Sequence, residues 1–128
     1  MIEGLFAGGN YATSLELMDV TMARHKALAA NVANVHTPGY QRIDIPEPFM
    51  DKLEAAIKSG DEVEIKGLGI PEMKEAKGFE PQTADGNNVN LDEEMMFIAE
   101  NAFAFEMSAQ MISSSLRRLE TAITGRVK

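Results

Sequence analysis

The side chains best suited to chemistry are few, and their spacing supports no catalytic arrangement. His25 and His36, the two histidines, have no carboxylate at a local spacing that would complete a metal site, so we predict structural roles for both. Ser113, Ser114 and Ser115 lie inside a helical pattern, without a nearby base to activate a hydroxyl nucleophile. The sequence contains neither a phosphate-binding loop nor a glycine-rich dinucleotide motif. We therefore expect a protein that is not an enzyme, with no cofactor and no catalytic or metal-binding residues.

The acidic run DGNNVNLDEE, residues 85–94, is the one stretch that suggests calcium binding. If Gly86 occupied the sixth position of a calcium loop, Pro81 would occupy the first, where a side-chain ligand is required. Proline has no such ligand, so the run fails as a calcium-binding loop. We predict instead a turn that leads into a capped helix.

The composition fits one structural unit with a lean core. The chain has 128 residues, no cysteine, no tryptophan and nine methionines, so disulfides are excluded and flexible methionine replaces rigid aromatics. The start has no basic segment followed by an apolar run, and no stretch approaches the roughly 20 apolar residues of a membrane span. We expect no membrane insertion, and either a cytoplasmic protein or one exported without a cleaved signal peptide.

The net charge of −8 is concentrated in the middle of the chain. Residues 1–40 hold three acids and two bases, residues 41–94 fourteen acids and six bases, and residues 95–128 three acids and four bases. A chain of this charge without a basic stripe is a poor nucleic-acid binder. The acidic middle is typical of a solvated surface, and the nearly neutral ends are expected to pack together or against partners.

The pattern over residues 14–34 predicts an amphipathic helix capped by Thr13 or Ser14, after a glycine-rich start that we expect to be mobile. Its expected apolar face, at three- and four-residue steps, comprises Leu15, Met18, Met22, Ala29 and Val32.

The residues after this helix predict that it ends in a tight turn. Asn31 and Asn34 lie one turn apart on one face, where their amides can hydrogen-bond to a neighbouring backbone. Pro38 and Gly39 suit the central positions of a type II turn, in which glycine supplies the positive φ. Tyr40 follows as an anchor with a polar tip.

The middle of the chain predicts small elements only. Residues 41–47 should be extended, residues 48–59 should form a short helix, and residues 62–66 should form an edge strand because their apolar residues alternate. Residues 72–90 have a composition close to that of a disordered segment.

The segment 92–124 predicts a long helix, capped by Asn90 or Asp92 and ended by Gly125. Its apolar residues follow a 3-4 repeat typical of a coiled coil, so the helix needs a partner, either the first helix or another subunit. The seam comprises Met95, Ile98, Ala102, Phe105, Ala109, Ile112, Leu116, Leu119 and Ile123.

Two blocks carry a resemblance to a known family. LAANVANVHTPGYQRIDI, residues 28–45, resembles the N-terminal signature of flagellar basal-body rod proteins, and DGNNVNLDEEMMFIAENAFAFEMSAQMI, residues 85–112, resembles their C-terminal region. Together the blocks favour a proximal rod subunit. His36 departs from the family pattern, which more usually has a small or acidic residue there. The resemblance implies that the following residues form an assembly motif: Asn31, Asn34, Thr37, Pro38, Gly39 and Tyr40.

The resemblance also implies a fold and a function. The fold is mainly α, with terminal helices forming a coiled-coil-like antiparallel pair or bundle and terminal residues disordered until assembly. Residues 1–40 would hold the first helix and the motif, 41–91 a variable middle that projects outward, and 92–128 the coiled-coil helix. Such subunits stack helically in a hollow rod, contact other rod subunits and the export gate at the basal-body base, and leave the cell through the flagellar type III apparatus.

Two alternatives remain open. One is a sibling rod subunit of the same family. The other is a soluble helical adaptor or export chaperone with an acidic surface, which should be a stable folded oligomer in isolation. Whether the helices pair within one chain or exchange between chains is also open.

Overall fold

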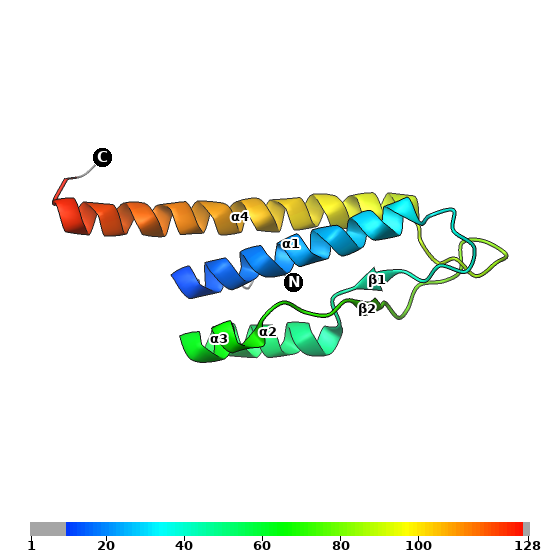
Figure 1. Cartoon of the computed structure of the whole chain (residues 1–128), viewed down its shortest axis with the longest axis horizontal. Coiled ribbons are helices and arrows are strands. Elements are labelled where there is room, and N and C mark those ends of the chain that lie inside the picture. Colours follow the sequence, from blue (N-terminus) through cyan, green and yellow to red (C-terminus); the bar gives the residue numbers. More distant parts are fainter. Residues whose placement is uncertain (1–9, 127–128) are drawn as a thin grey trace.

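The computed structural model describes residues 10–126 and is mainly helical (Figure 1). The expectation of a mobile N-terminus concerns residues that lie largely outside this range. No helix in this range is long and apolar enough to cross a membrane. The elements are α1 (Tyr11–Ala33), β1 (Ile43–Asp44), α2 (Glu47–Ser59), α3 (Glu62–Leu68), β2 (Lys74–Glu75) and α4 (Leu91–Thr124).

The two long helices, α1 and α4, pack against each other in opposite directions (Figure 1). This confirms the predicted antiparallel pair, formed here within one chain. Helix α4 is the longer, and its C-terminal end extends past the start of α1 (Figure 1). The two helices therefore share a contact over only part of α4.

Helix α1 starts earlier than predicted. Its N-cap is Asn10, whose side-chain oxygen accepts a hydrogen bond from the Thr13 amide at 2.8 Å. The prediction of Thr13 or Ser14 as the cap was wrong, because asparagine caps as well as serine and nothing in residues 11–13 breaks a helix. Ser14 instead donates its hydroxyl to the Asn10 carbonyl at 3.0 Å.

Helix α4 has the boundaries that its sequence predicts. The side chain of Asn90 accepts hydrogen bonds from the amides of Asp92 and Glu93, as one of the two predicted caps. Gly125 ends the helix with a φ of +65°, in the left-handed conformation that glycine adopts without strain.

The middle segment differs from the prediction at one element. Residues 62–66 belong to helix α3, so the predicted edge strand was wrong. Asp61 caps this helix by accepting hydrogen bonds from Val63 and Glu64, and the short apolar alternation could not exclude a helix. Farther along, β1 and β2 form a two-residue antiparallel pair with Ile43 opposite Glu75.

The apolar core lies between α1 and the middle segment. Leu17 and Val20 of α1 pack with Leu53 and Ile57 of α2, and all four are buried. Because α4 lies on the other side of α1, α1 is the central layer of the molecule (Figure 1).

Candidate functional site at the helix junction

Asn31 is the centre of a junction at which the end of α1, strand β1 and the start of α4 meet. Its side chain is fully buried and donates to the Ile43 carbonyl at 2.8 Å and to the Glu94 carboxylate at 3.1 Å. Its oxygen accepts from the Ile43 amide at 3.0 Å and from the Tyr40 hydroxyl at 3.2 Å. The side chain of Asn31 therefore binds a backbone segment of its own chain, and all of its hydrogen-bond donors and acceptors are used.

A buried chain of charges crosses the junction. Arg42 forms a salt bridge through Nε with Glu94, whose side chain is fully buried. Arg42 also contacts Asp44 at 2.9 Å, and Arg24 binds both oxygens of Asp44, at 2.9 and 3.1 Å. Burial alone would raise the pKa of Asp44, but the hydrogen bonds and charge of Arg24, with the Ile45 amide and Arg42, lower it below its usual value.

Two phenylalanine rings enclose the Arg42 guanidinium. Its central carbon lies 4.5 Å from the centroid of Phe79 and 4.6 Å from that of Phe97. The two rings meet edge to face with centroids 6.3 Å apart. Cation–π contacts of this kind are strongest when the cation is desolvated, as it is here.

The run 85–90 ties the end of α1 to the start of α4. The side-chain nitrogen of Asn87, Nδ2, lies within hydrogen-bond distance of the carbonyls of Asn34, Val35 and Thr37, at 3.0, 3.2 and 2.8 Å. These carbonyls follow the last turn of α1, and those of Asn34 and Thr37 also accept hydrogen bonds from the backbone amides of Thr37 and Tyr40. Asn88 accepts from the backbone amide of Arg42 at 2.7 Å, so the run also holds the segment after the turn.

The predicted turn is present at residues 37–40. The Tyr40 amide donates to the Thr37 carbonyl at 3.2 Å, and Gly39 has a φ of +72°, as a type II turn requires. Thr37, Pro38 and Gly39 are exposed, and the Thr37 hydroxyl donates to the Asn34 side chain at 3.0 Å. Burial, with the negative charge of Glu94, raises the pKa of Tyr40.

The six residues of the predicted assembly motif thus fall in two environments. Asn31 and Tyr40 belong to the inside of the junction, and Thr37, Pro38 and Gly39 form its exposed tip. Asn34 lies between them and donates to the Ala30 carbonyl of its own helix at 2.8 Å.

The apolar face predicted for α1 lies mostly at the surface. Leu15 is 36% and Met22 49% exposed, Ala29 is exposed, and Met18 and Val32 are half-buried. The buried apolar positions are Ala12, Leu17, Val20, Ala27 and Leu28. Since α1 is packed on two sides, its buried surface is broader than one stripe and includes polar residues. We call the predicted face the α1 row.

The seam predicted for α4, which we call the α4 row, is also largely outside the helix pair. Ile98, Phe105, Ala109 and Ile112 are half-buried. The exposed members are Met95, Ala102, Leu116, Leu119 and Ile123. The fully buried positions of α4 are instead polar or small, namely Glu94, Asn101, Ala104 and Ser108. Asn101, for example, donates to the Thr21 carbonyl of α1 at 2.8 Å.

The end of α4 carries the most exposed part of this row. From 116 to 124, which we call the overhang, Leu116 is 50%, Leu119 57% and Ile123 77% exposed. Within residues 10–126, no residue of α4 beyond Ser108 is buried. The overhang is therefore an apolar helix end that α1 does not cover.

Comparison with known proteins identifies the family. The C-terminal region of flagellar basal body rod proteins of the FlgEFG type matches residues 82–124. FlgB of Escherichia coli K12 is 30% identical over 117 residues, which cover 80% of this chain and 83% of the relative. FlgB of Aquifex aeolicus is 30% identical over 127 residues, covering 97% and 98%. The chain belongs to the FlgB family of flagellar basal body rod proteins.

The sequence similarity to FlgB proteins extends over nearly the whole chain. FlgB of Bacillus subtilis, at 26% identity, matches 94% of this chain and 97% of its own length. These relatives are FlgB proteins rather than a sibling rod protein such as FlgC, which the sequence analysis left open. They are structural rod proteins, and the part of the chain that the structure describes contains no group of three potential metal ligands.

Several junction residues were not singled out from the sequence, above all Arg42, Asp44, Asn87 and Glu94. Arg42 and Asp44 alternate with the isoleucines of an extended segment, which suggests a solvated face, and Glu94 fits the acidic first turn of a helix. The only local signal was the asparagine-rich run 87–90, because three asparagines near a helix end provide many amide donors and acceptors.

Proposed function

We propose that this chain is a structural, non-enzymatic subunit of the proximal rod, assembling helically through its terminal helices to build the drive shaft of the flagellar motor. The observation that carries the proposal is the exposed apolar α4 row on a member of the FlgB family. Exposed apolar area of this kind marks an interaction surface.

The pairing of the helices explains how one subunit can be folded and still bind others. Helix α4 packs against α1 and buries Asn101, Ala104 and Ser108, while many of its large apolar side chains are exposed. Contacts between different surfaces of successive subunits do not close on themselves and generate a helical filament. The α1 and α4 rows supply such surfaces.

We assign different roles in assembly to different regions of the chain. Residues 1–40 and 92–128 provide the assembling helices, and residues 41–91 form the acidic middle that faces away from the axis. The exposed tip at Thr37–Gly39 contacts neighbouring subunits, while Asn31 and Tyr40 fix its direction from inside. The net negative charge of the middle repels acidic surfaces of nearby subunits.

The partners are other subunits of the flagellar rod and the export gate at the base of the basal body. Copies of this chain also associate with one another in the rod, which spans the periplasm. The chain reaches the rod through the flagellar export apparatus without a cleaved signal peptide. It binds no nucleic acid and does not insert into a membrane.

Deletion of the gene in its source organism, followed by imaging of basal bodies in the cell envelope, tests this function. We expect membrane rings and export apparatus without a rod, and restoration of the rod when the gene is supplied again. Complete flagella in the deletion strain would contradict the rod function and favour a helical adaptor or chaperone.

A further inference from the structure

We propose that a groove between α1 and residues 70–73 receives the α4 overhang of a second copy of this chain. The inference rests on the proposed rod function and adds to it the acceptor surface for the overhang. The groove meets the helix junction at Ile43, which lines the groove and whose backbone binds Asn31.

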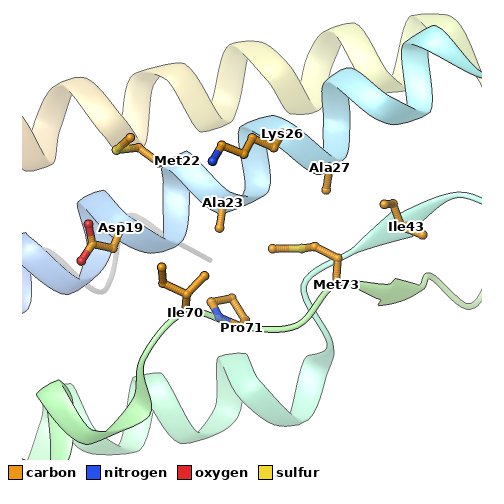
Figure 2. Close-up of a pocket in the computed structure, with 9 residues that line it drawn as sticks. All are labelled: Asp19, Met22, Ala23, Lys26, Ala27, Ile43, Ile70, Pro71 and Met73. Atoms are coloured by element: carbon orange, nitrogen blue, oxygen red, sulfur yellow. The ribbon is translucent and has the colours of Figure 1, made fainter.

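The groove is open and mainly apolar. It has a volume of about 420 Å³ and is lined on one side by α1 and on the other by Ile70, Pro71 and Met73. Figure 2 shows Ile70 and Met73 pointing toward α1, where the small side chains of Ala23 and Ala27 leave the space between them. Ile70 is 70% exposed, although it is a large aliphatic side chain at the edge of this space.

The overhang has the shape and chemistry that this groove requires. Its exposed Leu116, Leu119 and Ile123 follow one another at three- and four-residue steps and so lie on one side of the helix. The α1 helix of the same chain does not extend far enough to cover them (Figure 1). A helix that lays such a row into an apolar groove is a common mode of recognition.

Charge favours the end of α4 over other occupants. Residues 41–94, which supply one wall of the groove, hold fourteen acids and six bases, so this part of the chain disfavours acidic partners. Residues 107–128 hold four bases and one acid, and are the most basic stretch of the chain. At the groove, Asp19 lines one edge and Glu72 follows Pro71, while Lys26 is the one base among the lining residues. The basic helix end therefore complements the acidic body of the next copy.

The contact joins two different surfaces, a groove and a helix end. A row of copies would still offer one unoccupied groove at one end and one unoccupied overhang at the other, which is the condition for open-ended growth. A symmetric dimer would use both surfaces at once and stop.

Introduced cysteines can test this contact, because the chain has none of its own. Two differently tagged versions, Ile70→Cys and Leu119→Cys, are produced together in the deletion strain, and isolated basal bodies are treated with a short bis-maleimide. The control pair is Val63→Cys with Leu119→Cys, since Val63 is 80% exposed on α3 and does not line the groove. We expect a crosslinked product carrying both tags from the first pair, at about tenfold the yield of the control, because docking raises the local concentration of the two thiols.

The outcomes separate this inference from the rod function. If both tagged chains are in the rod fraction and the first pair gives no more mixed product than the control, the groove is not the acceptor and the rod function stands. If the unsubstituted chain does not restore the rod in the deletion strain, the rod function fails and this contact fails with it. Products of the Ile70→Cys chain with another protein alone would also overturn the second-copy assignment.

Discussion

The two ends of α4 are built in opposite ways. At its start, the buried side chains are charged or polar, and Glu94 is paired with Arg42 and Asn31 inside the chain. At its other end, Leu119 and Ile123 are apolar and exposed, and α1 does not reach them. The start of α4 buries paired polar groups, and the exposed apolar groups at its end suit the assembly contact that we propose.

This difference separates folding from assembly along a single helix. A buried charge pair contributes little net stability compared with apolar packing, but removing one partner leaves an uncompensated charge. The buried charge pair at the start of α4 therefore favours one arrangement of the junction over others in which the pair is broken. Exposed apolar residues contribute little to the fold of an isolated subunit, and their burial becomes favourable only on association.

The largest expected effect is at the start of α4. Arg42→Met leaves the buried Glu94 carboxylate without its cation, and should lower the free energy of unfolding by about 3–5 kcal/mol. The control is Lys58→Met, since Lys58 pairs with Glu54 at 2.6 Å on the surface, with side chains 74% and 48% exposed. Urea denaturation followed by circular dichroism should show a much smaller loss of stability for the control, because water screens the exposed pair. Equal losses in both variants would mean that the junction does not control stability.

The next largest loss of stability is expected at Asn87, which links the end of α1 to the segment before α4. Asn87→Ala removes the donor to three carbonyls at the end of α1, and should cost about 1–3 kcal/mol. Hydrogen exchange should accelerate at residues 35–40 while the middle of α1 stays protected. Gln82→Ala, which removes one exposed contact to Glu80, is the control and should leave exchange unchanged. Unaltered exchange in the Asn87 variant would contradict the role of this side chain.

A pH effect is expected at Glu16, a buried residue of α1. Burial, with the charge of Asp19, raises the pKa of Glu16 to about 7, and one of its buried oxygens has no partner within the described residues. The folded state therefore binds a proton more tightly than the unfolded chain, so stability is greatest below the usual pKa of 4.5 and falls as the pH rises through 7. Glu16→Gln should remove this fall and stabilise the protein by about 1–2 kcal/mol at pH 8, with little change at pH 4. Thermal unfolding at both pH values provides the measurement, and a parallel pH profile in the variant would count against this cause.

A smaller loss of stability is expected at the tip. Gly39→Val forces a β-branched residue into the left-handed region at a φ of +72°, at a cost of about 1–2 kcal/mol. We expect this variant and Asn34→Ala to remain soluble and yet fail to enter the rod. Gly67→Val, which has no positive φ and no atom near its added Cβ, is the control and should incorporate. Normal incorporation of the Gly39 and Asn34 variants would show that the tip has no part in assembly.

The smallest effect on stability is expected at the overhang. Leu119→Ser removes a side chain that is 57% exposed, so the free energy of unfolding should change by less than about 0.5 kcal/mol. Denaturant unfolding of the isolated subunit checks this value. A loss comparable to that of Asn87→Ala would place Leu119 inside the folding unit.

The fold could be predicted to a considerable extent because its main signals are local. Asn90 and Gly125 delimit α4, and Pro38 with Gly39 specifies the turn, through rules that involve only nearby residues. Local rules failed at α3, where a few alternating residues fit either a strand or a helix.

The faces of the helices and the junction could not be predicted in the same way. Hydrophobic periodicity selects the most apolar row of a helix, whereas α4 packs on α1 through Asn101, Ala104 and Ser108. A polar residue becomes a good interior residue only when its partner is present, and here the partners are distant in sequence. Arg42 and Glu94, for example, lie 52 positions apart.

The central claim, that the exposed end of α4 assembles the rod while the junction maintains the fold, is tested most directly by comparing two variants in the deletion strain. Leu119→Ser changes the overhang, and Val63→Ser removes an even more exposed apolar side chain from α3. Imaging of basal bodies should show rods in cells with the Val63 variant, and membrane rings without rods in cells with the Leu119 variant, at equal protein levels and equal stability. Rods in both strains would contradict the claim and require a different surface for assembly.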